Sequence, residues 1–566
     1  MITASAPAPA VDRPVPGRRT VRVIMAGLML GVLLSALDQM IIASALRTMA
    51  DRLDGLTFQG WATTSYLITS VLSAPLYGKL SDLYGRKTLY LISISVFLVG
   101  SLLCALAGSM YELAAYRAFQ GAGAGGLMPL ALAILADLLS PEERVRHQAY
   151  LGSVFGIASI AGPVLGGFFA GTDSLLGVDG WRWAFLINLP LGLIALVIVA
   201  RLFALPNRRV AQRVDYGGVA ALILGLVPML IVTERGTEWG WMSARSAAMI
   251  ALGLAGLGLF VLVERRMGDA ALLPPKLFRS RVFTLVNVIN FVVGIGIFGG
   301  MLLLPLYLQL VKGLSPTAAG LMLLPQTAAI LAASRIVGPI VVKTGRHREF
   351  LVLGVTAVAA SAFAFAALGV NTPLWVTGSV TAAMGLGVGV FFQVVMAALQ
   401  DGVLPRDIGV ASGLFTFFRQ IGGAAGTAIL VSVVFGVVGD RITQAFQAAH
   451  STPSFQAALH DSAVLADPAN RPVVQSAQDG NLIVDMNDTS FLEDLDPRLA
   501  APIIEGMSSA ISTAFLIVGI TLALAVFLPL LLGGSATVSS LARPSFLKPR
   551  TRSTRDDPGA TSRRTS

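Results

Sequence analysis

Apolar segments of about twenty residues recur along the whole chain, and short polar segments separate them. A helix of that length spans the hydrocarbon core of a lipid bilayer. The pattern predicts an all-α polytopic membrane protein with fourteen transmembrane helices, an even number that leaves both chain ends on one side. The expected spans are residues 23–46, 58–78, 89–108, 112–136, 149–171, 182–204, 216–233, 246–264, 282–311, 316–342, 350–369, 374–399, 408–438 and 507–533.

The composition supports a membrane protein. The 566 residues are 55% hydrophobic and 13% charged, whereas soluble domains carry roughly 25% charged residues. The sequence has no Walker-type phosphate loop and no His-Glu-x-x-His motif, and its single cysteine, Cys104, excludes an intrachain disulfide. We therefore expect neither an enzyme nor a bound metal or cofactor, and any transport would be driven by an ion gradient.

The basic residues predict the orientation of the chain. Its formal net charge is +10. With the N-terminus in the cytoplasm, most lysines and arginines fall in cytoplasmic segments, as the positive-inside rule requires. We expect both termini in the cytoplasm, and membrane lipids rather than nucleic acid as partners of the basic loops. The Ala-, Gly- and Arg-rich composition favours a bacterial protein, which would lie in the cell (inner) membrane.

Three polar segments lie outside the predicted helices. Residues 1–22 and 534–566 are expected to be disordered cytoplasmic tails, the second of them basic. Residues 439–506 form an acidic segment on the extracytoplasmic side. This segment has two interpretations: a solvated cap, or a lid or envelope-partner docking element over an outer exit.

The string GKLSDLYGRK, from Gly78 to Lys87, gathers charge between two apolar runs. An ordinary positive-inside loop is one interpretation. The string also resembles the signature loop of the major facilitator superfamily, which implies a conformational latch on the cytoplasmic face. The residues that match are Gly78, Asp82, Gly85, Arg86 and Lys87. The family usually has arginine directly after the acid, where this chain has Leu83, so Asp82 would need another basic partner such as Arg86.

Further strings extend the resemblance over residues 20 to 535. GIASIAGPVLGG resembles the antiporter motif of helix 5, with Gly162, Pro163, Gly166 and Gly167 at the matching positions. Small residues there also allow close helix packing. LAAYRAFQGAGAG resembles the helix 4 motif, with Arg117, Gln120 and Gly121 at the matching positions. The strings ALDQMIIASAL, WATTSYLI, WRWAFLINLPLG, DYGG, LPLYLQ and RQIGGAAGTAI resemble the 14-helix drug:proton antiporter branch, the EmrB- and QacA-like exporters. Arg47 departs from this branch, whose helix 1 motif usually ends in proline.

This resemblance implies a domain organisation. Residues 23–204 would form a six-helix bundle, and residues 205–265 an inserted pair of helices. Residues 266–438 and 507–533 would form a second bundle, related to the first by a pseudo-two-fold axis along the membrane normal.

The resemblance also implies a function. The chain would be a monomeric secondary transporter that exports amphipathic or hydrophobic drugs by proton-coupled antiport and alternating access, with the proton as coupling ion. An exporter of lipid, glycolipid or a hydrophobic natural product on the same fold is an alternative. A non-transporting scaffold or sensor is a third, supported only by the acidic segment.

Two ionisable residues are predicted at similar depth. Asp38 lies roughly 22 Å along the first helix, and Arg117 lies near the outer end of the fourth. Buried ionisable groups in membranes are costly and usually functional. We hypothesise that the two side chains approach each other and that Arg117 competes with a proton for Asp38. The alternatives are a static buried ion pair, or an Asp38 that lies near the water at the outer edge of the membrane.

Other polar or aromatic residues are candidates for the cavity lining. Arg419 is predicted near the membrane midplane, where it could pair with an acid, bind backbone carbonyls or contact an anionic substrate group. Asp215 is expected to cap the seventh helix. The cavity candidates are Gln39, Gln120, Asn287, Asn290, Tyr307, Gln309, Gln393, Phe417, Arg419 and Gln420.

Overall fold

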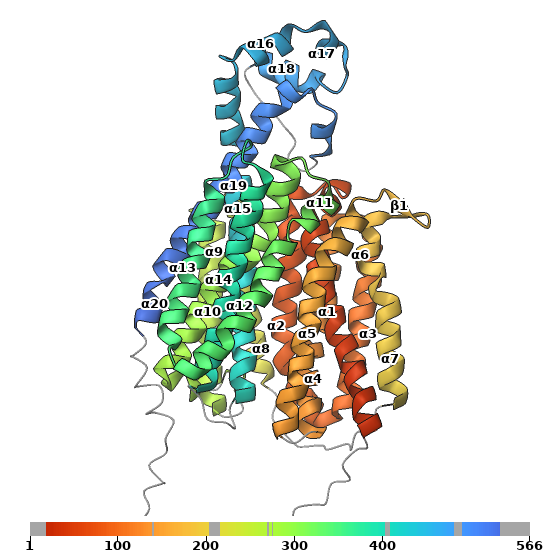
Figure 1. The fold of residues 1–566 in the computed structure, drawn as a ribbon, viewed down its shortest axis with the longest axis vertical. Coiled ribbons are helices and arrows are strands. Elements are labelled where there is room, and N and C mark those ends of the chain that lie inside the picture. The colour runs from red at the N-terminus through yellow and green to blue at the C-terminus, as the bar shows by residue number, and fades with distance from the viewer. Residues whose placement is uncertain are drawn as a thin grey trace, which may run out of the picture.

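A computed structural model shows long helices standing side by side with a group of short helices above one end (Figure 1). We call this end of the bundle the cap face, and the other end the opposite face. The described part of the chain begins at the opposite face, and its last helix ends part-way along the side of the bundle (Figure 1). The predicted tail 534–566 and most of tail 1–22 lie outside the described residues. The structure describes residues 18–138, 141–202, 215–268, 271–273, 275–401, 408–479 and 489–531.

The long helices form two bundles and an inserted hairpin. The first bundle consists of α1 (Arg18–Arg52), α2 (Gln59–Tyr84), α3 (Arg86–Ala105), α4 (Met110–Leu138), α5 (Pro141–Ala170), α6 (Trp183–Leu186) and α7 (Asn188–Leu202). The inserted helices are α8 (Tyr216–Trp239) and α9 (Ala244–Met267). The second bundle consists of α10 (Arg281–Leu306), a π-helical turn (Tyr307–Val311), α11 (Pro316–Leu321), α12 (Leu324–Thr344), α13 (His347–Ala366), α14 (Leu374–Asp401), α15 (Ile408–Ala449), α19 (Pro497–Ala525) and α20 (Phe527–Leu530).

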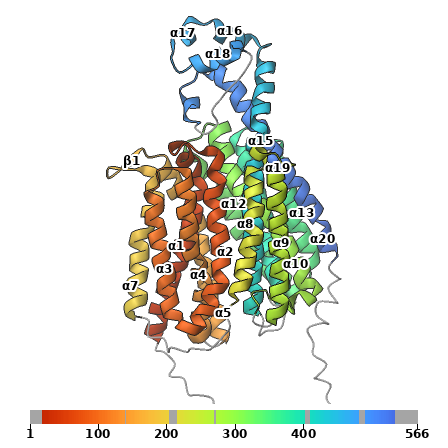
Figure 2. The same ribbon diagram turned by 180° about the vertical axis from the view of Figure 1, so that it is seen from behind.

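In the described residues, twelve helical segments are long and apolar enough to cross a membrane. Helix α2 is not among them, and within α5 the apolar stretch of the described side chains is Gly156–Ala170. Both nevertheless stand beside the other long helices (Figures 1 and 2) and pack closely, α2 on α4 and α5 on α1. The expected count of fourteen spans is compatible with this arrangement.

The two bundles repeat one packing pattern. In the first, α1 packs on α5, α2 on α4, and α3 on both α4 and α7. In the second, α10 packs on α15, α12 on α14, and α13 on both α14 and α19. The same neighbours recur in the same chain order, as expected for an internal structural repeat.

The inserted helices α8 and α9 pack on each other, and α8 also contacts α15 and α2 (Figure 2). The predicted cap at Asp215 is confirmed, because its Oδ1 accepts a hydrogen bond of 2.7 Å from the backbone N–H of Gly218. The carboxylate of Glu264, near the end of α9, accepts bonds from the backbone N–H groups of Leu272 and Leu273.

The acidic segment carries short helices with a small apolar core. Helix α15 runs on above the bundle to Ala449, and α19 begins at Pro497, so both helices extend into residues 439–506. Phe446 and Phe455 contact each other there, with ring centroids 5.6 Å apart. The cap also contains α16 (Pro453–His460), α17 (Ser462–Ala466), α18 (Arg471–Asp479) and a 3-10 turn (Ser490–Glu493).

Arg498 holds this cap together by charge. Its guanidinium donates to Asp461 and Asp496 at 3.0 Å. These hydrogen bonds hold the pKa of both carboxyl groups below their usual range. The pairs are partly exposed, so they contribute modestly to stability.

A second polar contact ties the cap to the first bundle. The backbone N–H and hydroxyl of Thr489 donate to Asp51 Oδ1 on α1 at 3.1 and 2.8 Å. Arg47 donates to the same hydroxyl at 3.3 Å and pairs with Asp51 at 3.2 Å. Arg47, which departs from the resembled family motif, therefore contributes to the cap contact.

Candidate transport site

Asp38 on α1 and Arg117 on α4 form a buried ion pair. Arg117 Nη1 donates to Asp38 Oδ2 at 2.6 Å. Asp38 is 0% exposed and Arg117 is 1% exposed. The structure thus places in contact the two side chains that the sequence suggested would approach each other. A buried pair of this kind stays intact only if further hydrogen bonds satisfy the remaining polar atoms.

Amide and hydroxyl groups supply those further bonds. Asp38 Oδ1 accepts from Gln120 Nε2 on α4 and from Asn188 Nδ2 on α7, both at 2.9 Å. Gln120 Oε1 accepts from Arg117 at 2.7 Å. Gln120 and Asn188 also donate to the hydroxyl of Ser101 on α3. The acid is therefore held by three side chains from two helices, α4 and α7.

Helix α2 completes the surroundings of Arg117. Its guanidinium lies over the ring of Tyr66, 4.0 Å from the centroid, and its Nε donates to the carbonyl of Ala62 at 3.2 Å. The network thus joins α1, α2, α3, α4 and α7. A shift of α1 against α4 would have to break several hydrogen bonds of this network together. The network is therefore expected to be either fully formed or fully broken, which gives the two helices two discrete arrangements.

Sequence reasoning did not single out Tyr66, Ser101 or Asn188. A signal was available, because each is a polar side chain inside a predicted apolar span, and Asn188 stands in the string LINLPLG. Nothing in the chain order indicates that the three join one network around Asp38 and Arg117, because only the packing of the helices brings them together.

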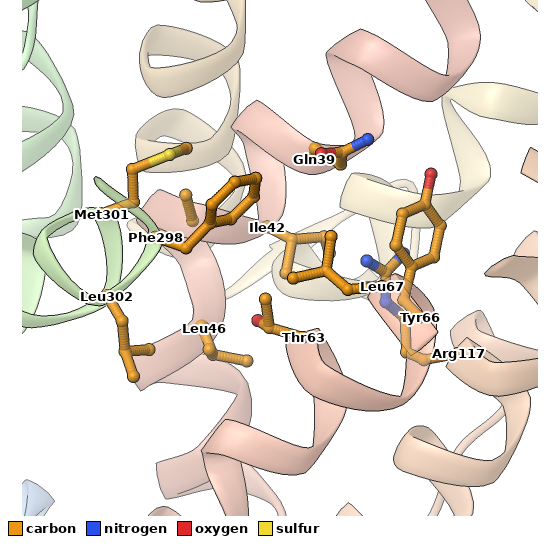
Figure 3. A pocket seen from close by; sticks show the side chains of 11 residues that line it. Gln39, Ile42, Leu46, Thr63, Tyr66, Leu67, Arg117, Phe298, Met301 and Leu302 are labelled. Carbon is orange, nitrogen blue, oxygen red and sulfur yellow. The ribbon is translucent and has the colours of Figure 1, made fainter. Parts of the chain in front are cut away.

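A small cavity of about 30 Å³ lies next to this network, between the two bundles (Figure 3). Arg117 and Tyr66 stand at one end, and Phe298, Met301 and Leu302 of α10 stand at the other (Figure 3). The lining is largely apolar, with few polar groups, as is usual for small-molecule sites. The remaining lining residues are Gln39, Ile42, Ala43, Leu46, Thr63 and Leu67.

Several other cavity candidates are packed within the second bundle or along the seam. Asn287 is buried and donates to its own helix at Phe283. Asn290 is buried and donates to the backbone carbonyl of Phe415 on α15. Phe417 is buried and belongs to the apolar cluster of the first bundle, so it packs across the seam.

Gln309 and Tyr307 lie near the cap face. Gln309 Nε2 donates to the carbonyl of Ser44 on α1 at 3.3 Å and so links the two bundles. Tyr307 donates to the carbonyl of Gly369 at 3.1 Å. Both lie in the π-helical turn that follows α10, and both are buried.

Gln393, Gln420 and Arg419 are partly buried. Gln393 on α14 lies against Gly338 on α12. Gln420 and Arg419 are neighbours on α15, and the Arg419 guanidinium lies over the rings of Phe392 and Phe415.

The residues of the antiporter-like motif lie where α5 meets its neighbours. Gly162 and Gly166 face Met40 and Ile41 of α1, so close that a Cβ on either would overlap with them. Pro163 lies inside α5, and its carbonyl faces Gly320 of α11.

Gly167 makes the contact between the bundles. Its Cα faces the backbone of Pro316 and Thr317 at the start of α11, where an added Cβ would lie 2.5 Å from a carbonyl oxygen. The Thr317 hydroxyl donates to the Gly167 carbonyl at 2.9 Å. The small residues of this motif therefore let α1, α5 and α11 approach closely near the cap face.

The latch-like segment lies at the opposite face and is not the loop that the sequence predicted. Gly78 to Tyr84 form the last turns of α2, and Arg86 and Lys87 begin α3. Gly85 adopts a positive φ of 97°, which favours glycine, and ends α2. Arg86 donates to the hydroxyl of Ser81, and Lys87 donates to the carbonyl of Ala200. A Cβ at Gly78 would have open space around it. The Asp82 side chain lies outside the described residues, so its expected basic partner stays a prediction.

This fold and site were compared with known proteins. The family model described as Major Facilitator Superfamily matches residues 28–427. The chain belongs to the Major Facilitator Superfamily. Members of this superfamily are membrane transporters, so the chain is a transporter and not an enzyme, as the sequence predicted.

Relatives within the superfamily align over most of the chain. The multidrug transporter protein MdtP of Bacillus subtilis is 33% identical over 75% of this chain and 78% of its own length. Multidrug resistance protein 3 of Bacillus subtilis is 30% identical over 92% of this chain and 96% of its own. A tetracycline resistance determinant of Streptomyces rimosus is 37% identical over 54% of this chain and 88% of its own.

A solved structure shares the fold. A bacterial homologue of the human lysosomal transporter Spinster, crystallised inward-facing and unoccupied, superposes with a TM-score of 0.62. It covers 94% of this chain and 99% of its own at 15% identity, a level that shows the fold alone.

Proposed function

We propose that this protein is a secondary active efflux transporter that exports amphipathic or hydrophobic drugs, or related compounds, in exchange for protons. The position of Arg117 carries the proposal, because the same guanidinium pairs with Asp38 and lines the cavity between the bundles. A substrate in that cavity and a proton on Asp38 would both act on Arg117. The names of the relatives, which include multidrug transporters, support the choice of drugs.

In the proposed cycle the two bundles rock about the cavity and open it to each side of the membrane in turn. Movement of α1 against α4 separates Asp38 from Arg117, and a proton then replaces the guanidinium as partner of the carboxylate. The return movement restores the pair and releases the proton to the other side. Protons that enter along their gradient thus drive the substrate outward.

We further propose that the transporter lies in a bacterial cell membrane as a monomer, with the cap outside and both termini in the cytoplasm. The distribution of lysine and arginine between the two faces supports this orientation. The latch-like segment from Gly78 to Lys87, at the opposite face, would then stabilise the state closed towards the cytoplasm.

The test uses purified protein in proteoliposomes loaded with ethidium. An imposed proton gradient is expected to drive dye movement, and a protonophore should abolish that movement. Dye movement that ignores the gradient would contradict proton coupling. Dye that stays in place while a fluorescent phospholipid changes leaflet would favour the alternative, a lipid or glycolipid exporter.

A further inference from the structure

Arg419 is a cation deep within the second bundle. It lies roughly 16 Å along α15 from Ile408, at 1.5 Å per residue, on a helix that packs on α10, α19 and α2. Charged groups at such depth are rare unless a partner or a water-filled space compensates them. The groups around this guanidinium therefore show how its charge is compensated.

The described residues supply no carboxylate for Arg419. Its Nε is buried without a hydrogen-bond partner among them, and none of their ion pairs includes it. The acidic residues of the second bundle whose side chains are described lie towards helix ends, at Glu349, Asp440 and Glu505. Among the described side chains, this bundle thus holds a permanent positive charge with no matching negative charge at its depth.

Aromatic rings hold the guanidinium in place. Its central carbon lies 5.1 Å from the centroid of Phe392 on α14 and 5.8 Å from that of Phe415, one turn earlier on α15. Asn290 donates to the backbone carbonyl of Phe415 and so fixes this turn of α15 against α10. Rings contact the face of a guanidinium and leave the N–H groups at its edge available to an acceptor.

Arg117 shows what is missing around Arg419. Each guanidinium lies over an aromatic ring within one of the two similarly packed bundles. Arg117 also has a carboxylate at 2.6 Å, whereas Arg419 has none among the described residues. Because Arg117 already neutralises Asp38, the charge that lacks a partner among these described residues is the positive charge of Arg419.

We propose that Arg419 binds the acidic group of the transported compound, so that the transporter accepts amphipathic organic anions, with an apolar body and a carboxylate or sulfonate. This inference rests on the proposed function and names its substrate class. The apolar body would occupy the largely apolar space between the bundles, beside Phe298 and Met301. A planar guanidinium suits this role because it can donate two parallel hydrogen bonds to a carboxylate.

The experiment compares two probes that differ only in charge. An undecyl chain carries a dansyl group at one end and either a carboxylate or an ammonium group at the other. Binding to purified protein in nanodiscs is measured by dansyl fluorescence, and export by proteoliposome transport. The variants are Arg419→Gln and Arg419→Lys, and Arg441→Gln on the same helix near the cap is the matched control.

Arg419→Gln is expected to weaken carboxylate binding by about tenfold or more, because a hydrogen bond to a charged group is lost. Ammonium binding should stay within about twofold, Arg419→Lys should retain part of the carboxylate affinity, and Arg441→Gln should match the wild type. Equal losses for both probes in folded protein, or unchanged carboxylate binding, would overturn the inference.

The two proposals can fail separately. Arg419-dependent carboxylate binding without gradient-driven export would support the anion site and contradict the efflux function. Proton-driven export of the ammonium probe with no effect of Arg419→Gln on the carboxylate probe would support efflux and overturn the anion site.

Discussion

Arg117 and Asp38 lie 2.6 Å apart on different helices, and neither side chain reaches solvent. Removing one partner of such a buried pair costs about 3–5 kcal/mol of folding stability, because the other charge is left uncompensated. The pair also stands beside the cavity between the bundles. Every variant of this network can therefore lose export either by unfolding or by a direct effect on transport, so folding stability is measured beside transport.

Asp38→Asn is expected to abolish the response of export to a proton gradient while substrate binding is retained. An amide still accepts one bond from Arg117, and Asn188 can turn its unpartnered Oδ1 towards the new N–H₂ group. The loss of stability should therefore stay below the figure for a broken pair. Gradient-driven export is measured in proteoliposomes and unfolding in detergent. Full gradient-driven export would remove Asp38 from the coupling mechanism.

Asn188→Leu is expected to change the pH dependence of export more than substrate affinity. The substitution removes one of the two amide donors to Asp38 Oδ1 and the bond to Ser101, without touching the cavity lining. The measurement is export rate and apparent KM from pH 5 to 9, a range chosen to cover typical assay conditions. Thr233→Val, which loses only a bond within α8, is the control. An unchanged pH profile in folded protein would show that Asn188 has no part in coupling.

Gly167→Ala is expected to hinder closure of the cap face. The new Cβ would lie 2.5 Å from the Pro316 carbonyl oxygen, and overpacking of this kind costs about 1–3 kcal/mol, or roughly tenfold in a conformational equilibrium. Gly156→Ala on the same helix is the matched control, because its Cβ would meet Leu331 at an ordinary 3.5 Å. The accessibility of a cysteine introduced at the cap face should rise only for Gly167→Ala. Equal accessibility of that cysteine in both variants would refute a role of Gly167 in closure.

Thr489→Val is expected to loosen the cap from α1. The substitution removes the hydroxyl that donates to Asp51 and accepts from Arg47, a loss of about 1 kcal/mol. Hydrogen exchange in residues 453–479 and at the cap-face end of α1 should increase. Thr443→Val, which loses an exposed bond to its own helix, should leave exchange unchanged. Equal hydrogen exchange in both variants would show that the Thr489 contact does not hold the cap to α1.

Acid should loosen the cap through Asp461 and Asp496. Arg498 lowers the pKa of both carboxyl groups, so their ion pairs are fully present above the ordinary value of about 3.9. The stabilisation is lost as the pH falls through the lowered values in the folded cap. Hydrogen exchange in residues 453–479, corrected for intrinsic rate, should rise between about pH 5 and pH 2.5. Arg498→Gln should exchange faster already at pH 5 and show a smaller further rise, and a variant indistinguishable from wild type would contradict this account.

The sequence by itself determined the class of protein and much of its organisation. Apolar runs of membrane-spanning length require helices in lipid, because every backbone polar group must be satisfied within the segment. Short strings such as GKLSDLYGRK and GIASIAGPVLGG resemble motifs of the superfamily, and their glycines suit tight turns and close helix contacts. The shared depth of Asp38 and Arg117 could be counted along two helices, since each residue advances a fixed 1.5 Å.

Only the tertiary structure decided which side chains meet. Asn188 bonds to Asp38, and Ser101 bonds to Asn188 and Gln120, because α3 and α7 pack beside α1 and α4. Helix rotation cannot be read from apolar runs that lack a polar face. The acidic segment became a helical cap because a few apolar side chains and Arg498 pair residues far apart in the chain. Arg419 could be placed in depth from the sequence, but its aromatic surroundings come from two helices that only folding brings together.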